Sequence, residues 1–282
     1  MNYQEILRRH GFTFDKARGQ NFLTNPSVCP RMAEAGAALH AGVLEIGPGA
    51  GVLTRELSRA AKKVVAVELD ARLLPVLAET LEDCPNVTVI QGDILAVDLA
   101  ALLKEHFDGL PVYVCANLPY YITSPVIMRL LESRLPFEAV TVMVQKEAAR
   151  RLYAPMGTRA CGAITAAVQY YAEPRVLFPV SRGSFVPAPN VDSAVLRLVP
   201  RREPPVNLPR GQEDEAAFFR LVRAAFGQRR KTAANAIGAG LGMEKSAVLA
   251  AMGRAGIAPN ARAEELTLEE FARLLGELSN FS

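Results

Sequence analysis

The chain has 282 residues, of which 50% are hydrophobic and 22% are charged, and its formal net charge at pH 7 is +3. These values are typical of a globular protein, and the length suits a full α/β domain with a smaller second domain. The net charge is too small to identify a nucleic-acid-binding protein by itself, so the distribution of charge has to be considered.

Particular residue types exclude other classes of protein. The four cysteines (Cys29, Cys84, Cys115 and Cys161) form no C-x-x-C pair, which predicts reduced core thiols. The three histidines lack metal-ligand spacing, so we expect no metal site. No apolar run approaches the roughly 20 residues of a membrane span. The polar, basic stretch 1–14 has no signal-peptide core, which predicts a cytoplasmic protein without a membrane partner.

Short apolar runs alternate with helical patterns along the first part of the chain. A helix is expected over residues 25–39, with Asn25 as its N-cap and Pro26 at its first position. Strands are predicted at 43–46, 64–68, 87–90, 112–116 and 139–144, and helices at 51–61, 71–81, 99–106, 124–131 and from Lys146 onward. Continuous apolar runs are typical of strands buried on both faces, so this alternation predicts a doubly wound, mainly parallel sheet.

The pattern loosens towards the C-terminus. Two late strands are predicted at 176–180 and 194–199, separated by a stiff loop from Phe185 to Ser193. The proline-rich run 200–205 resembles an interdomain linker, and only helical patterns follow Glu213. We therefore predict an α/β domain over residues 1–203 and a small all-helical domain over residues 204–282.

Glycines and acids follow the first three predicted strands. The run Glu45-Ile46-Gly47-Pro48-Gly49-Ala50-Gly51 opens a helix, and its glycines allow a ligand to approach the backbone closely. Glu68 ends the second strand, where a carboxylate can accept hydrogen bonds from both hydroxyls of a ribose. Asp93 ends the third strand and can accept from an adenine amine, although such an acid is about as often a helix cap.

These positions predict a pocket for an adenosine without a phosphate clamp. The spacing G-x-G-x-G differs from the dinucleotide pattern G-x-G-x-x-G, and the sequence contains no P-loop motif. S-adenosylmethionine is an adenosine ligand that lacks phosphate, so we predict it as the cofactor.

The run Asn117-Leu118-Pro119-Tyr120 lies just past the strand 112–116. The Asn117 amide oxygen and the Leu118 carbonyl can both accept from one NH2 group, while Pro119 fixes the turn. Tyr120 offers a ring face for stacking, and Phe185 is the candidate for the opposite face. Together with the glycine loop and the two acids, this run predicts methyl transfer onto the exocyclic amine of a base.

Two basic regions are candidates for RNA contact. The segment 218–232 contains no acid, and its cations are Arg220, Arg223, Arg229, Arg230 and Lys231. The run 229–232 is expected to begin or end a helix, which suits phosphate binding. The second region contains Lys146 and Arg150. Either region is alternatively a solvated helix face.

At this point the chain resembles the KsgA family, the ribosomal RNA adenine N(6),N(6)-dimethyltransferases. The resemblance rests on 19–23 (Gly-Gln-Asn-Phe-Leu), 45–51, 68–70, 92–93, 117–120, 145–147 (Gln-Lys-Glu) and 185–193, which occur in the family's order. It implies a Rossmann-like class I methyltransferase fold and S-adenosylmethionine as methyl donor. By the same resemblance, the donor site is lined by Asn21, Leu23, Gly47, Glu68, Asp93 and Asn117.

The resemblance also implies the substrate. We expect a monomer that dimethylates two adjacent adenosines near the 3′ end of small-subunit (16S) ribosomal RNA, within a small ribosomal subunit or its precursor. A large-subunit RNA methyltransferase that confers macrolide resistance is an alternative, as is a non-catalytic assembly or transcription factor on the same fold. A nicotinamide dehydrogenase is disfavoured by the glycine spacing and by the run 117–120.

Overall fold

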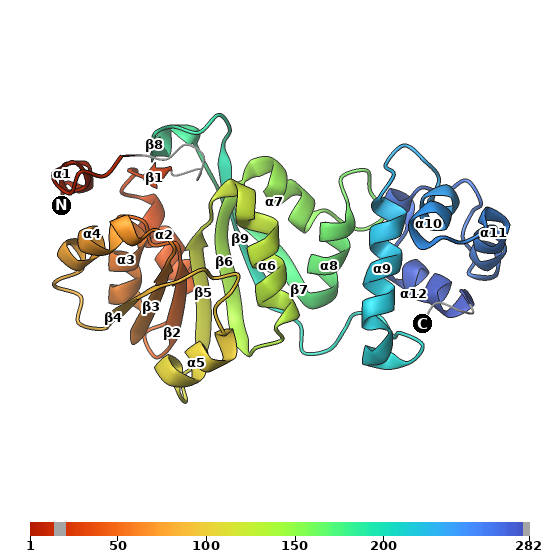
Figure 1. The fold of residues 1–282 in the computed structure, drawn as a ribbon, viewed down its shortest axis with the longest axis horizontal. Helices are drawn as coiled ribbons and strands as arrows, with labels where there is room; N and C mark the ends of the chain where they lie inside the picture. The colour runs from red at the N-terminus through yellow and green to blue at the C-terminus, as the bar shows by residue number, and fades with distance from the viewer. Residues whose placement is uncertain (14–20, 279–282) are drawn as a thin grey trace. The chain divides into compact units, whose positions relative to one another are not determined.

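The computed structural model describes residues 1–13 and 21–278, and Figure 1 shows its fold. Its central element is a seven-stranded sheet with the strand order β4-β3-β2-β5-β6-β9-β7. The parallel strands are β2 (Gly42–Ile46), β3 (Lys63–Glu68), β4 (Val87–Gln91), β5 (Val112–Asn117) and β6 (Phe137–Gln145). All five residues of β2 are buried because both faces of the sheet are covered. The predicted doubly wound sheet is confirmed.

The strand order reverses at β2, where β3 and β4 lie on one side and β5 and β6 on the other. The loops that leave two adjacent strands diverge at such a point, so a crevice opens at the carboxyl ends of the strands. Ile46 of β2 is in register with Val67 of β3 and with Ala116 of β5. The segments that follow these three residues therefore meet at one edge of the sheet.

Helices cover the faces of this sheet. On one face, α2 (Val28–Gly36) and α3 (Val52–Ala60) share a buried apolar cluster with Val43, Val64 and Cys115. The remaining helices of this region are α1 (Tyr3–Arg9), α4 (Leu74–Thr80), α5 (Leu99–Phe107) and α6 (Thr123–Glu132). All four cysteines are free and buried, in agreement with the predicted core thiols.

The helix α2 begins later than the sequence predicts. Its N-cap is Ser27 rather than Asn25, and Pro26 precedes it. The Asn25 side-chain oxygen accepts from the Ser27 amide at 3.0 Å and from the Ser27 hydroxyl at 2.9 Å. These bonds form a local turn before the helix, which is the competing use of an asparagine side chain.

A small two-stranded sheet joins two distant segments. β1 (Phe22–Leu23) pairs antiparallel with β8 (Phe185–Val186), so that Leu23 lies opposite Phe185. Residues 185–186 were expected to be part of a loop, and this expectation is corrected here. A two-residue strand is too short to show alternation, and its pairing partner is far away in the sequence. Gly19 and Gln20, which carry part of the family resemblance, lie outside the described residues.

The far edge of the large sheet is formed by late elements. β9 (Ser193–Pro200) pairs antiparallel with β6, and β7 (Ala172–Val180) completes the sheet. The segment between β6 and β7 contains α7 (Lys146–Tyr153) and α8 (Ala163–Tyr171). The sequence pattern did not predict α8. Six of its nine residues are buried, so it lacks the polar face from which helical periodicity is recognised.

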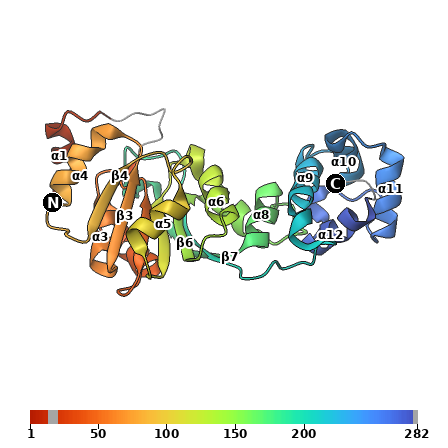
Figure 2. The same cartoon turned by 60° about the horizontal axis from the view of Figure 1, so that its bottom comes forward.

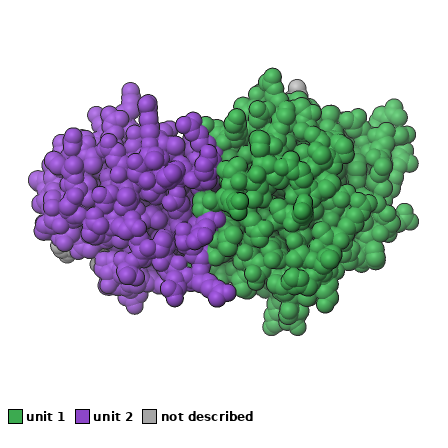
Figure 3. Space-filling model, turned by 180° about the vertical axis from the view of Figure 1, so that it is seen from behind, with its two compact units in different colours: residues 1–149, 174–200 green, residues 150–173, 201–282 purple. Residues whose placement is uncertain are grey.

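The C-terminal helices gather in a bundle (Figure 2). They are α9 (Glu215–Phe226), α10 (Ala233–Leu241), α11 (Lys245–Arg254) and α12 (Leu268–Glu277). The chain divides into two compact units, coloured separately in Figure 3: unit 1 contains residues 1–149 and 174–200, and unit 2 contains 150–173 and the chain from 201 onward. In the described residues, no helix is both long and apolar enough to cross a membrane.

This division differs from the predicted boundary at residue 203 because residues 150–173 belong to unit 2. The reason is aromatic packing. The ring of Tyr171 stacks on Phe219 with a centroid distance of 5.3 Å, and its hydroxyl donates to Glu215 at 2.6 Å. Such contacts between distant residues leave no trace in local composition.

Candidate active site

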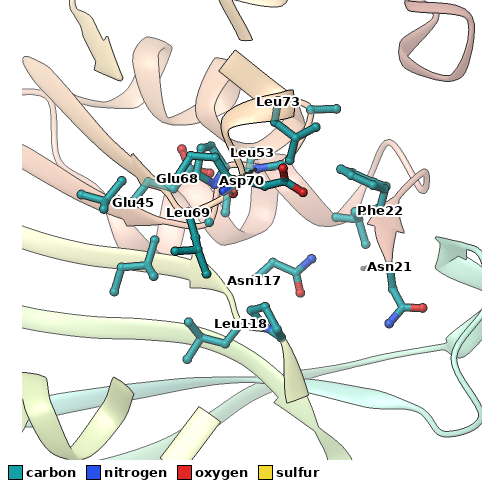
Figure 4. Close-up of a pocket in the computed structure, with 18 of the residues that line it drawn as sticks. Asn21, Phe22, Glu45, Leu53, Glu68, Leu69, Asp70, Leu73, Asn117 and Leu118 are labelled. Atoms are coloured by element: carbon teal, nitrogen blue, oxygen red, sulfur yellow. Dashed lines mark hydrogen bonds between the residues drawn. The ribbon is translucent and has the colours of Figure 1, made fainter. Parts of the chain in front are cut away.

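The predicted cofactor and catalytic residues line one cavity at the carboxyl ends of β2, β3 and β5 (Figure 4). The cavity volume is about 150 Å³. The predicted residues that line it are Asn21, Leu23, Gly47, Gly49, Glu68, Asp93, Asn117, Leu118, Pro119, Tyr120 and Phe185. The predicted RNA-binding residues do not line this cavity.

The glycine loop forms a backbone cradle between β2 and α3. Gly49 has a φ of +60° and Gly51 a φ of +85°, a region that strains any other residue. A Cβ at Gly49 would lie 2.8 Å from a ring carbon of Phe22. The Phe22 ring therefore lies directly on the loop and closes one side of the cradle. The sequence reasoning did not identify Phe22, because its role depends on this contact.

The carboxylate of Glu68 is held in place by main-chain amides. One oxygen accepts from the Gly49 amide at 3.2 Å, and the other accepts from the Asp70 amide at 2.8 Å. Each carboxylate oxygen has two lone-pair sites, so both can accept a further hydrogen bond. Burial raises the pKa of Glu68, whose side chain is almost enclosed. The fixed carboxylate suits recognition of two neighbouring hydroxyls.

Asp93 lines the cavity and also organises a turn. Its Oδ1 accepts from the Leu95 amide at 2.9 Å, and its side chain is exposed. Asp93 therefore caps a turn rather than a helix, since the next helix, α5, has Asp98 as its N-cap. The contact with an adenine amine stays a prediction. Asp70 is the N-cap of the 3-10 turn Ala71–Leu73, because its side chain accepts from the Arg72 amide at 3.2 Å.

The run 117–120 is fixed by hydrogen bonds at its neighbours. The Leu118 amide donates to the Met143 carbonyl at 3.2 Å, and the Tyr120 hydroxyl lies 3.0 Å from Ser193 Oγ. The half-buried Asn117 side chain makes no hydrogen bond to any residue that the structure describes. In Figure 4 this side chain projects from the end of β5 into the cavity. Its amide is thus available to a ligand at a rigid position.

Phe185 lines the cavity but offers it little surface. Its ring is 3% exposed and packs in the same apolar cluster as Leu23 and Cys29. Tyr120 is half-buried, and burial raises the pKa of its hydroxyl. The predicted stacking of a base between Tyr120 and Phe185 stays a prediction, with Tyr120 as the more accessible ring.

Glu45 is a cavity residue that the sequence reasoning did not assign to the site. Its side chain is 1% exposed, and its Oε2 atom has no hydrogen-bond partner among the described residues. Burial and, to a lesser extent, the negative charge of Glu68 raise the pKa of Glu45 to about 8. The available signal was an acid within an otherwise apolar buried strand, directly before a glycine loop.

The substitution Glu45→Gln is expected to stabilise the protein more as pH rises. Above pH 4.5 the unfolded chain releases the Glu45 proton, whereas the folded protein retains it up to about pH 8. Because the folded protein keeps this proton, the free energy of unfolding falls across that window, by about a few kcal/mol in total. Glutamine causes no such fall. Urea unfolding at pH 5 and at pH 8.5 measures the difference.

The matched control for this prediction is Glu34→Gln, on the exposed side of α2. Because this carboxyl is exposed, its replacement should change the stability little. A Glu45→Gln difference in stability that does not grow with pH would show that the buried carboxyl does not titrate in this way.

None of the basic candidates lines the cavity. Arg229, Arg230 and Lys231 are exposed in the turn before α10, whose N-cap is Thr232. The predicted position at a helix end is thereby confirmed as a helix start, which favours anions. Arg220 and Arg223 border a groove between α9 and α10 whose other walls include Ala236 and Gly240 of α10. Lys146 and Arg150 are both exposed on α7.

Comparisons with known proteins bear on this site. A family model described as ribosomal RNA adenine dimethylase matches residues 11–280. The chain is 49% identical over 280 residues to ribosomal RNA small subunit methyltransferase A of Geobacillus thermodenitrificans. This match covers 98% of this chain and 94% of that protein. It is 46% identical over 280 residues to the protein of that name from Streptococcus sanguinis, with 98% and 95% covered.

Two solved structures share the fold. A dimethyladenosine transferase from Plasmodium falciparum superposes with a TM-score of 0.73 at 26% identity, covering 92% of this chain and 97% of that chain. The 23S rRNA methyltransferase ErmE superposes with a TM-score of 0.67 at 29% identity, covering 92% and 100%. The resemblance expected from the sequence is confirmed by the family model and by the curated relatives together. The chain belongs to the ribosomal RNA adenine dimethylase family.

Proposed function

We propose that this chain dimethylates the exocyclic N6 amine of two adjacent adenosines near the 3′ end of small-subunit ribosomal RNA, with S-adenosylmethionine as methyl donor. The observation that carries this proposal is the position of Asn117. Its amide has no partner among the described residues and lines the same cavity as the glycine loop and Glu68. An acceptor for an amine thus stands beside a site suited to an adenosine.

The chemistry of the cavity fits this donor. Glu68, fixed by two amides, can accept from the ribose hydroxyls. The glycine cradle leads into α3, whose N-cap Gly51 gives no side-chain hydrogen bond to the first amides of the helix. We assign to Asp93, which lines the cavity, the acceptance of a hydrogen bond from the adenine amine of the donor. When bound there, S-adenosylmethionine supplies a methyl group activated by a positive sulfonium. Two further residues complete the expected donor site: Leu23, on β1, and Asn21, just before β1.

Asn117 and Leu118 orient the target amine. The Asn117 amide oxygen and the Leu118 carbonyl accept its two hydrogens, which favours a pyramidal nitrogen with a directed lone pair. The acceleration then comes mainly from positioning and from fixed dipoles. The methylated amine is acidic and loses its proton readily, so no strong general base is required. After the first methylation only one hydrogen remains, and one of the two acceptors releases its bond.

The substrate must present an unpaired adenine, because a base within a duplex cannot enter such a cavity. Tyr120 provides a ring on which that base can stack, held in place by its hydrogen bond to Ser193. Contact with the RNA backbone is assigned to the exposed cations Arg229, Arg230 and Lys231, with Arg220, Arg223, Lys146 and Arg150 as further candidates.

The names of relatives with high sequence identity support small-subunit RNA as the substrate. The Geobacillus and Streptococcus relatives are named small-subunit methyltransferases, whereas the 23S enzyme is 29% identical. A non-catalytic assembly factor would not need an intact Asn117 in a complete donor cavity. Membership of the family also removes the dehydrogenase alternative. A monomer acting in the cytoplasm is part of the proposal, and light scattering in solution tests the oligomeric state.

The decisive experiment uses labelled S-adenosylmethionine with undermethylated small ribosomal subunits and, separately, with naked large-subunit RNA. Reverse-transcription stops then map the modified positions. Dimethyladenosine at two neighbouring 3′-end adenosines of the small-subunit RNA would support the proposal. Label in large-subunit RNA alone would assign the chain to the resistance enzymes. Donor binding without any label would favour the assembly factor.

A further inference from the structure

Tyr121 is an exposed aromatic residue at the mouth of the cavity. Of the aromatic side chains in the described ranges, Tyr121 is the most exposed at 56%, followed by Tyr153 at 44%. Tyr121 nevertheless lines the cavity, next to Tyr120. An aromatic ring that is both exposed and at the edge of a binding site has an unused apolar face.

The turn that carries Tyr121 is rigid. The Pro119 carbonyl accepts from the Ile122 amide at 3.2 Å and from the buried Thr123 hydroxyl at 3.4 Å. On the other side, Tyr120 is held by Ser193. Since the backbone on both sides of Tyr121 is fixed, its ring is presented at a defined place without the entropic cost of ordering a loop.

Folding does not explain the presence of an aromatic residue at this position. Tyr121 belongs to neither of the buried apolar clusters described in unit 1. In the described part of the chain, its hydroxyl makes no hydrogen bond. A polar residue would be equally compatible with such an exposed turn, so the ring is more simply explained by a ligand.

The chemistry of the substrate indicates which ligand. The proposed target is one of two adjacent adenosines, and when one base enters the cavity the other remains attached through a single phosphodiester. The neighbouring base must therefore lie near the mouth of the cavity, with its stacking partner lost. An exposed tyrosine ring can replace that partner, because every base has a π face.

We propose that Tyr121 is a stacking platform for the base next to the target adenosine, so that the site holds a dinucleotide rather than a single base. This inference rests on the proposed function and extends it. A ring face makes no hydrogen bond to the N6 amine, so it accepts the neighbouring adenine before and after dimethylation. That property suits an enzyme whose two targets are adjacent.

The test uses small subunits in which 2-aminopurine replaces one of the two adenosines, so that the other remains as target. The fluorescence of 2-aminopurine falls when it stacks. The labelled subunits are saturated with unmodified protein and S-adenosylhomocysteine. The fluorescence of 2-aminopurine should then be low when the probe occupies one of the two positions beside the target. With Tyr121→Ala the bound complex should be at least about twofold brighter, and KM for the subunit should rise about tenfold with little change in kcat. Tyr121→Phe should restore both values.

The control is Tyr153→Ala, which removes an exposed tyrosine that does not line the cavity and should leave probe brightness unchanged. Equal brightness and equal KM for Tyr121→Ala and unmodified protein would refute the platform. If the unmodified protein methylates the remaining adenosine when S-adenosylmethionine replaces S-adenosylhomocysteine, the proposed function still stands. Absence of methylation by the unmodified protein would instead refute the proposed function.

Discussion

Replacement of Asn117 by alanine is expected to reduce methyl transfer by at least about 10²-fold while RNA affinity changes little. The reason is that the side chain contributes an oriented acceptor at the reacting amine, and loss of one such fixed dipole typically costs 10² to 10³ in turnover. The Asn117 side chain makes no hydrogen bond among the described residues, so its removal should not destabilise the fold. Single-turnover methylation of undermethylated small subunits, with RNA affinity measured in parallel, checks this result.

A second asparagine provides the matched control. Asn86 donates from its side-chain amide to the carbonyls of Ser58 at 2.8 Å and Ala61 at 3.1 Å, and none of these residues lines the cavity. Asn86→Ala should lower the free energy of unfolding by about 1–3 kcal/mol but leave the folded enzyme active. If Asn117→Ala lost RNA binding and methylation to the same extent, the role assigned to Asn117 would be wrong.

Reversal of charge at Arg229, Arg230 and Lys231 is expected to weaken RNA binding by about 10² or more at physiological salt. The three side chains are exposed in the turn before α10, where the helix N-terminus adds a favourable field for phosphate. Each phosphate contact that is lost should reduce the slope of log affinity against log salt by about 0.7 to 0.9. Filter binding or anisotropy across a range of salt concentrations measures both quantities.

A control with the same change in net charge separates local contact from general repulsion. The control reverses three exposed lysines: Lys62, just after α3, Lys104 on α5 and Lys245 on α11. Their replacement by glutamate should leave the slope of log affinity against log salt nearly unchanged. Binding of S-adenosylmethionine should be normal in both variants, since none of the six residues lines the cavity. An unaltered slope in the 229–231 variant would exclude this surface from phosphate contact.

Local sequence predicted most elements of the sheet because burial on both faces leaves a direct pattern. The strand expected at 43–46 is β2 (Gly42–Ile46), and the strand expected at 112–116 is β5 (Val112–Asn117). The glycine loop and the run 117–120 were identifiable because their chemistry lies in consecutive residues. Parallel strands then place these loops at one edge of the sheet, so the position of the site follows from the alternation of elements.

Elements without periodicity were the ones that local sequence missed. The helix α8 is buried almost all round, and β8 is a pair of residues within a proline-rich segment. Residues 150–173 were expected in the first domain, yet the aromatic contacts of Tyr171 place them in unit 2. In each case the deciding interaction joins residues far apart in the chain, and composition records only the local residues.

The sequence by itself determined the order of most strands and helices of the large sheet and the chemical identity of most residues at the site. Only the tertiary structure decided how those residues are presented. It enclosed Glu45 so that its pKa rises to about 8, laid the Phe22 ring on Gly49, and left Tyr121 exposed at the mouth of the cavity. The physical reason is that desolvation, close packing and exposure depend on neighbours brought together by the fold, whereas helix and strand patterns depend on neighbours along the chain.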